Sequence, residues 1–457
     1  MTNDALTDLT SKLRGTVFTA TDEGYDEARR IWNGTVDKRP AVIVRCGGVA
    51  DVIDAVNYAR EQGLSVSIRG GGHHVAGSAL NDDGLVIDLS QMRSVRVDPA
   101  AGTARAEGGA QIVDVDRECM PFNLCVPLGV FSETGIAGIT LAGGVGWLRR
   151  KYGMTCDSLV SADVVTADGK LVKASATENP DLFWALRGGG WDMGVVTSFE
   201  YQARPIEPEI AFLFVTYPID EAAQVMRGVH EFMRSASDAF SPLLVLWTFP
   251  EDEAYPQEVW GKQFIAIVGP YAAHAEEGMR AIEPLRHLGT VLLDASETTT
   301  YYAVQHLFDH EYPKGRRYYW KSSYLTGLEE GAIEQLIEFG KNRPSALSSV
   351  DVWTLGGAIS RIGADETPLS QRQAPYMIGI EANWDDPAAD AANIAWTREL
   401  ASALQPFSTG ASYLNFEDLS ETGAAKATHG ANFERLVRIK KQYDPENLFR
   451  SRRGLVD

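Results

Sequence analysis

Three consecutive glycines at the end of a predicted strand constrain this chain more than any other feature. Leu64–Arg69 reads as a β-strand and runs directly into the segment Arg69–Gly77, written RGGGHHVAG. Because glycine has no Cβ, such a run can turn several backbone N–H groups toward one point. A nest of this kind binds phosphate without basic side chains. The junction therefore predicts a phosphate site or a tight loop, and taken alone it leaves both open.

Two more glycine clusters follow within the first 200 residues. Residues Gly135–Gly146 interleave glycine and alanine with aliphatic side chains, and a third cluster covers Arg187–Gly194. A surface of small residues lets a flat ring system lie close to the backbone. Close packing of helices through small residues explains the second cluster equally well.

The chain changes character near Pro205–Pro208. Before this point, short strands alternate with helices such as Val49–Gln62, and from there to about Gln405 the glycine clusters stop. The later part alternates longer strands with amphipathic helices, which is typical of an α+β domain. After Tyr413 we expect a strand and the helix Ala431–Tyr443. The sequence thus predicts three parts, which are residues 1–205, 206–410 and 411–457.

Charge and cysteine content narrow the class of protein. The net charge is −20, which argues against a nucleic-acid or anionic-membrane partner. No apolar run reaches the roughly 18 residues of a membrane span, and the N-terminus lacks a secretory pattern. The four cysteines are sparse and form no CxxC pair, which fits a reducing cytoplasm. We expect a cytoplasmic monomer or homodimer that acts on a small molecule.

Several common catalytic motifs are absent. No GxGxxG follows a strand, and neither a P-loop nor a GxSxG serine is present. His306 and His310 would share one face of a helix, but no third ligand is apparent. We therefore expect no metal site and interpret these histidines as surface or packing residues.

In their order and spacing, the glycine clusters and the motifs around them resemble one family. The chain is similar to flavoproteins of the vanillyl-alcohol oxidase and p-cresol methylhydroxylase fold, in the berberine-bridge-enzyme-like branch. The resemblance implies an α+β architecture: a two-part FAD-binding domain with an inserted α+β substrate domain on an antiparallel sheet. The segments that carry it are 39–45, 68–77, 84–89, 134–147, 150–159, 181–190, 194–197, 413–416 and 443–449.

The same resemblance implies a covalent cofactor. His73 corresponds to the histidine that is joined to the flavin 8α-methyl group. The branch often adds a cysteinyl bond, but the matching position here is Phe131, which cannot form a thioether. We therefore expect FAD to be attached through His73 alone. The chain departs from the family pattern at Asp192-Met193 and at Arg450–Gly454.

The resemblance also suggests a reaction. Removing hydride from an alcohol requires a group that takes the hydroxyl proton, and Tyr413 is the candidate, with Asn415 shaping the pocket. We expect oxidation of an alcohol or sugar C–OH with O2 as acceptor. Amine C–N oxidation of the 6-hydroxynicotine oxidase type, a flavin-binding protein without oxidase activity, and an NADPH-dependent UDP-sugar reductase remain alternatives. Strands 316–324 and 376–384 should complete the pocket.

The expected FAD-binding residues come from the motifs matched above. They are Arg69, Gly70, Gly71, Gly72, His73, His74, Gly77, Thr134, Gly135, Gly138, Gly143, Gly144, Gly146, Val195, Val196 and Asn415.

Overall fold

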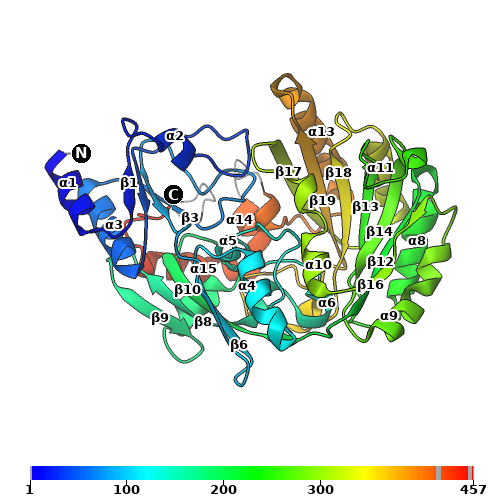
Figure 1. Ribbon diagram of the computed structural model, residues 1–457, viewed down its shortest axis with the longest axis horizontal. Helices are drawn as coiled ribbons and strands as arrows, with labels where there is room; N and C mark the ends of the chain where they lie inside the picture. The colour runs from blue at the N-terminus through cyan, green and yellow to red at the C-terminus, as the bar shows by residue number, and fades with distance from the viewer. Residues whose placement is uncertain (1–2, 418–423, 451–454, 456–457) are drawn as a thin grey trace.

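The computed structural model describes residues 3–417, 424–450 and 455, and it confirms a mixed α+β fold. Figure 1 shows a blue-to-cyan half that contains small sheets beside a green-to-orange half built on one large sheet. The end of the chain returns to the first half, where Val66 N donates to Leu448 O at 3.2 Å. Residues near both ends of the sequence therefore build the same region.

The first half contains two sheets and a short ribbon. One sheet has the order β1-β2-β4-β3, with β2 and β3 parallel to β4; the other is antiparallel with the order β5-β6-β10-β8-β9. The strands are β1 (Thr16–Phe18), β2 (Val42–Arg45), β3 (Val66–Arg69), β4 (Leu85–Asp88), β5 (Val95–Asp98), β6 (Thr103–Glu107), β7 (Leu124–Cys125), β8 (Leu159–Val165), β9 (Leu171–Ser175), β10 (Val195–Gln202) and β11 (Arg204–Pro205), of which β7 and β11 form the ribbon.

The second half is built on an antiparallel sheet with the order β15-β12-β14-β13-β18-β19-β17, and β16 also pairs with β12. This arrangement agrees with the antiparallel sheet expected for the inserted region. The strands are β12 (Ile210–Pro218), β13 (Leu243–Thr248), β14 (Gln263–Tyr271), β15 (Leu293–Asp294), β16 (Glu297–Thr299), β17 (Arg317–Leu325), β18 (Ser349–Thr354) and β19 (Tyr376–Trp384).

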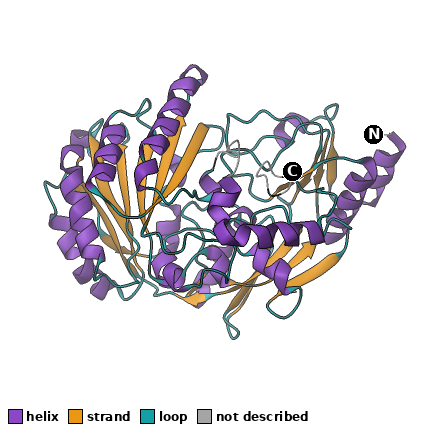
Figure 2. Ribbon diagram, turned by 180° about the vertical axis from the view of Figure 1, so that it is seen from behind, coloured by secondary structure: helices purple, strands orange, loops and turns teal. Residues whose placement is uncertain are grey.

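Some helices cover one face of the large sheet, and others lie between the two halves, as Figure 1 and the view from behind in Figure 2 show. The α-helices are α1 (Asn3–Lys12), α2 (Tyr25–Ala28), α3 (Val49–Gln62), α4 (Ile112–Cys119), α5 (Ile136–Leu141), α6 (Arg149–Tyr152), α7 (Pro180–Leu186), α8 (Ala222–Met233), α9 (Ala275–Ile282), α10 (Tyr301–His306), α11 (Glu330–Lys341), α12 (Ala358–Arg361), α13 (Asp390–Ala403), α14 (Ala424–His429) and α15 (Phe433–Tyr443).

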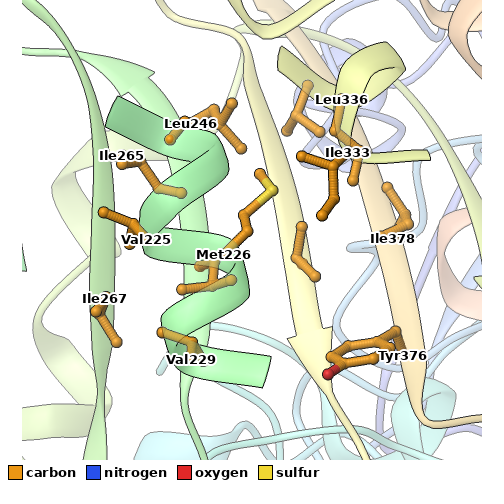
Figure 3. Close-up of a cluster of buried hydrophobic side chains, with 14 of the residues drawn as sticks. Val225, Met226, Val229, Leu246, Ile265, Ile267, Ile333, Leu336, Tyr376 and Ile378 are labelled. Atoms are coloured by element: carbon orange, nitrogen blue, oxygen red, sulfur yellow. The ribbon is translucent and has the colours of Figure 1, made fainter. Parts of the chain in front are cut away.

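The large sheet has two differently used faces. On β19, Ile378 and Ile380 join a core with α8 and α11. Figure 3 shows Ile378 among the side chains of this core. The alternate residues Met377 and Glu381 point to the opposite face, because successive side chains of a strand alternate. Both faces of β18 and β19 are buried. One face holds the core, and the other is available to line a site.

Two buried arginines of α6 join the halves. Arg149 donates to Thr354 O at 2.8 Å and to Pro242 O, while Arg150 donates to Leu355 O at 2.6 Å. Burial lowers the pKa of Arg149 to about 9. Main-chain carbonyl groups of the large sheet thus satisfy these guanidinium groups, and this fixes α6 against the sheet.

Two local predictions were wrong. The segment at Tyr413 is not a strand: Tyr413 is extended, and Leu414–Phe416 form a 3-10 turn. The Tyr413 N–H donates to the Ser322 hydroxyl instead of pairing with the backbone of a neighbouring strand. His306 and His310 do not share a helix, since α10 ends at His306 and a separate 3-10 turn holds His310.

Candidate active site

A cavity extends between the glycine loops and the large sheet. One wall consists of the first two glycine clusters and β3, and the other consists of aromatic side chains from β17 and β18. Residues from the C-terminal segment complete it. Residues that line the cavity include Ser67, Gly70, Gly71, Gly72, His73, His74, Thr134, Gly135, Gly138, Trp191, Val196, Trp320, Trp353, Met377, Tyr413, Asn415, Phe416, Phe449 and Arg450.

The first glycine loop is built for backbone contact. Within the described residues, the N–H groups of Gly71 and Gly72 have no hydrogen-bond acceptor. Gly72 has φ +66°, which glycine adopts without strain. A Cβ on Gly71 would lie 2.4 Å from Gly135 N, so the first and second clusters touch through their backbones. This contact requires glycine at position 71, and both residues line the cavity.

The Arg69 side chain is held by protein partners next to the first glycine loop. Its guanidinium forms an ion pair with the buried Asp88, and it also donates to Ala28 O. The side chain does not line the main cavity but a second depression, which Gly70, Gly71 and His73 also line. Arg69 therefore anchors the strand that leads into the glycines.

His73 sits in an aromatic stack at the end of this loop. Its ring stacks on Trp32 with centroids 4.1 Å apart, and Trp32 stacks on Tyr318 of β17 at 3.7 Å. The imidazole is partly open to the cavity, yet desolvation by the surrounding protein lowers the pKa of His73 to about 3. The ring is therefore neutral and held in one orientation.

His74 connects the loop to the C-terminal segment. Its Nδ1 accepts a hydrogen bond from Ala76 N at 3.2 Å, so its Nε2 carries the proton and donates to Leu414 O at 3.0 Å. The turn containing Leu414 is thereby placed over the first glycine loop.

The second cluster divides into lining and packing positions. Thr134, Gly135 and Gly138 line the cavity, and Trp191 Nε1 donates to Gly138 O at 3.0 Å. The other predicted positions of this cluster lie outside the lining: a Cβ would meet Leu369 at Gly143, Thr155 at Gly144, and Leu128 O at Gly146.

Two further predicted residues also lie outside the cavity lining. Gly77 forms a turn with φ +63°, where a Cβ would lie 2.7 Å from Val36. Val195 belongs to the core beneath β4, while its neighbour Val196 faces the cavity.

Tyr413 lies at the junction of the two walls. Its hydroxyl oxygen accepts hydrogen bonds from Val145 N and from Asn415 Nδ2, both at 2.9 Å. The Tyr413 N–H donates to the Ser322 hydroxyl of β17 at 2.7 Å. Burial raises the pKa of Tyr413 to about 12, although both hydrogen bonds to the oxygen favour the ionised form. With two N–H groups donating to its oxygen, the phenol still has its own proton to donate.

The cysteines do not reach the site. None of the four, all within the described part of the chain, lines the cavity. Phe131 lines it instead, with its ring centroid 6.3 Å from that of His73.

Sequence reasoning missed an acidic pair on the large sheet. Asp351 of β18 and Glu381 of β19 line a pocket next to the main cavity. The available signal was an acid inside each of two otherwise apolar strands, SVDVWT and YMIGIEANW.

Comparison with known proteins gives a consistent result. A model for the FAD binding domain matches residues 40–175, and a model for berberine and berberine-like proteins matches residues 412–455. The chain is 32% identical over 450 residues to the uncharacterized FAD-linked oxidoreductase YgaK of Bacillus subtilis, covering 96% of each chain. It is 29% identical over 451 residues to a xylooligosaccharide oxidase of Thermothelomyces thermophilus, covering 92% of this chain and 87% of that protein.

A solved structure supports the same class. The chain superposes on 6-hydroxy-D-nicotine oxidase from Arthrobacter nicotinovorans with a TM-score of 0.87 at 28% identity, covering 97% and 98% of the two chains. Fold, cavity and relatives together define an FAD-linked oxidoreductase with the p-cresol methylhydroxylase type of FAD-binding fold. The chain belongs to the berberine-like family of these enzymes.

The residues present fit FAD. The unpaired N–H groups of Gly71 and Gly72 suit a diphosphate, and the small surface at Gly135 and Gly138 leaves room for a ring system. Among the described residues, no three His, Cys, Asp or Glu side chains are grouped so as to hold a metal ion. In the same residues no helix is long and apolar enough to cross a membrane.

Proposed function

We propose that this enzyme removes hydride from an alcohol or sugar C–OH group of a small substrate, with O2 as the final acceptor and FAD attached through His73 alone. Residues 1–205 and 411–457 form the FAD-binding part, and residues 206–410 form the substrate-binding part. When bound, FAD supplies a two-electron acceptor. The observation that carries the proposal is the Tyr413 hydroxyl, fixed by two N–H donors at the cavity junction.

The neutral state of His73 supports its role as the point of attachment. Alkylation of an imidazole requires a free ring-nitrogen lone pair, and a histidine with a pKa of about 3 has one at any physiological pH. Stacking on Trp32 fixes the ring plane. Phe131 occupies the position of the second, cysteinyl bond, so a single bond follows.

Tyr413 would act on the substrate hydroxyl. Its oxygen is held by Val145 N and Asn415, which stabilise negative charge there. Burial opposes that charge and keeps the phenol neutral in the protein alone. In its neutral form Tyr413 would orient the substrate by donating its proton to the substrate oxygen. The ionised form, which the two N–H donors stabilise, would accept the hydroxyl proton as the C–H bond breaks.

A second candidate, oxidation of an amine C–N bond, is favoured by one specific observation. The pocket beside Trp353 contains Glu311, Asp351 and Glu381, and among the described residues no Lys, Arg or His lines it. An acidic pocket of this kind suits a substrate that carries an amine. Oxidation of a neutral amine needs no catalytic base, because the nitrogen lone pair assists the loss of hydride.

A substrate panel monitored by anaerobic flavin bleaching tests the proposal. Bleaching by an alcohol or sugar, with hydrogen peroxide formed when air is admitted, is the expected result. Bleaching by amines alone would replace the alcohol proposal with the second candidate, and a flavin that no substrate reduces would contradict both.

A further inference from the structure

Two places where the chain departs from the family pattern meet at one buried side chain. Asp192 belongs to the third glycine cluster, and Arg450 follows Phe449 near the end of the chain; all three residues line the main cavity. The ammonium group of Lys440, on α15, donates to Asp192 O and to Phe449 O, both at 2.8 Å. Asp192 and Lys440 are 248 positions apart in sequence. One side chain therefore joins two distant segments that line the cavity.

The Lys440 ammonium group is fully satisfied by protein atoms. Its third acceptor is Asp444 Oδ2, four residues further along the chain. A lysine has three N–H donors, and here the three donors have three acceptors. The side chains of Lys440 and Asp444 are only 1% and 0% exposed. Because burial removes the hydration of both charges, the pair needs these hydrogen bonds, and their geometry fixes the groups around it.

Asp444 extends the connection toward the end of the chain. Its Oδ1 accepts a hydrogen bond from Leu448 N at 2.8 Å, and its Oδ2 accepts one from Phe449 N at 2.9 Å. The chain reverses between these residues at Asn447, which has φ +52°. Residues 444–449, called the C-terminal turn below, are thus wound around one carboxylate.

The C-terminal turn lies against the strand that leads into the first glycine loop. Val66 of β3 pairs with Phe449 in an isolated parallel bridge, and Val66 N donates to Leu448 O at 3.2 Å. Val66 also lines the cavity. The C-terminal turn, β3 and the third glycine cluster therefore enclose the same part of the cavity.

Stability alone does not account for a lysine at this position. A buried ion pair is often no more stabilising than apolar side chains of similar volume. What the ion pair supplies is geometry, because three hydrogen bonds from one nitrogen fix Asp192 O, Asp444 and Phe449 O relative to one another. Two of these residues, Asp192 and Phe449, line the cavity that fits FAD.

We propose that Lys440 is a positioning residue for FAD. It holds the third glycine cluster against the C-terminal turn, so that Asp192, Phe449 and Arg450 keep their places in the cavity wall. Lys440 lies outside the cavity lining and acts through the residues that it binds. The inference concerns the binding of FAD and holds whichever substrate is oxidised.

Titration with FAD tests the proposal. Covalent attachment would hide a change in affinity, so the comparison uses the full-length His73→Ala protein after removal of bound FAD. Lys440→Met keeps most of the side-chain length but removes the three donors. Adding it to this protein should weaken FAD binding about tenfold or more, because the cavity wall is no longer preorganised. Unchanged FAD affinity in the folded variant overturns the proposal. Both proteins carry His73→Ala, so the comparison does not depend on where the flavin is attached.

Arg372→Met is the matched control for a general loss of stability. Arg372 donates to Asp157 Oδ1 at 2.7 Å, and the two side chains are 2% and 5% exposed, but neither residue lines the main cavity. Chemical denaturation should show that both variants are destabilised, whereas FAD affinity should fall only in Lys440→Met. Equal losses of FAD affinity would assign Lys440 to fold stability alone and overturn the proposal.

A double variant covers the case in which Lys440→Met does not fold. Removing the lysine leaves the Asp444 carboxylate buried without its cation, whereas Lys440→Met combined with Asp444→Asn removes both charges. The double variant should fold and bind FAD about tenfold more weakly or worse. Native FAD affinity in this protein would contradict a positioning role.

Visible circular dichroism of the flavin in the otherwise native enzyme provides a readout that fold stability does not move. The flavin bands report how the ring is held by its surroundings. Lys440→Met should alter their intensity, and Arg372→Met should leave them unchanged. Flavin bands that are identical in the native enzyme and in Lys440→Met would contradict the proposal.

Discussion

The two walls of the cavity are built by different means. The wall that belongs to the matched FAD binding domain is made of backbone, where glycines such as Gly71 and Gly135 bring chain segments into direct contact. The opposite wall is made of side chains from β17, β18 and β19, among them Trp320 and Trp353. A backbone wall accepts one cofactor and tolerates almost no added atoms, whereas a side-chain wall can vary with the substrate. This division suits a family whose relatives carry the names of both nicotine and sugar oxidases.

The largest expected effect is a loss of stability when the core on the helical face of the large sheet is disturbed. Leu336 of α11 is fully buried in the helical layer shown in Figure 3, on the face away from the cavity. Leu336→Ala should lower the free energy of unfolding by about 2–5 kcal/mol, because it leaves a cavity in the core. Chemical denaturation measures this loss. Altered flavin absorbance in the folded variant would show that the two faces are not independent.

Tyr413→Phe tests the junction of the walls. It keeps the ring and its packing but removes the hydroxyl. Anaerobic stopped-flow should show the reductive step slowed about 100-fold or more if Tyr413 accepts the substrate proton, with flavin binding unchanged.

The pH profile provides a second readout for the same variant. With a pKa of about 12, ionised Tyr413 becomes more abundant as pH rises, so the native rate should increase with pH. The variant should lose this rise. A change below about threefold would indicate that Tyr413 only packs, and would favour amine oxidation.

Gly71→Ala tests the backbone wall. The added Cβ would lie 2.4 Å from Gly135 N, so the two loops must separate. Overpacking costs about 1–3 kcal/mol, and FAD retention should fall by about 10- to 100-fold if the loops move apart. The flavin-to-protein absorbance ratio of the purified variant measures FAD retention.

Gly327→Ala is the matched control, because a Cβ at that position meets nothing within 4 Å. Equal flavin content in the two variants would show that close backbone contact is not what holds the cofactor.

The smallest effect is expected from removing the covalent attachment. His73→Ala should fold and retain FAD by non-covalent contacts, since the N–H groups of Gly71 and Gly72 remain. Turnover should fall by about tenfold as the flavin potential drops. A redox titration and steady-state rates measure both. An insoluble protein, or an unchanged potential, would mean that the bond has another role.

The sequence predicted the backbone wall better than the side-chain wall for a physical reason. The conformational freedom of glycine is local, so RGGGHH alone predicted a backbone turn after β3, although it left open whether that turn binds phosphate. The side-chain wall depends on which residues of distant strands share a face. Asp351 and Glu381 lie 30 positions apart in sequence and meet only through the pairing of β18 with β19.

The Tyr413 segment illustrates a second limit. The family's Tyr-x-Asn pattern suggested a strand, but hydrogen bonds to Ser322 and His74 from other parts of the chain fix a 3-10 turn instead. Such tertiary contacts override local preference and leave no mark in the segment itself.

Peptide mass spectrometry of the purified enzyme tests the central claim most directly. After proteolysis, the flavin mass should appear on the peptide that contains His73 and on no cysteine-containing peptide. The protein should also stay yellow after acid precipitation. Flavin on a cysteine, or complete release of FAD by acid, would contradict an enzyme whose cofactor is held by His73 alone.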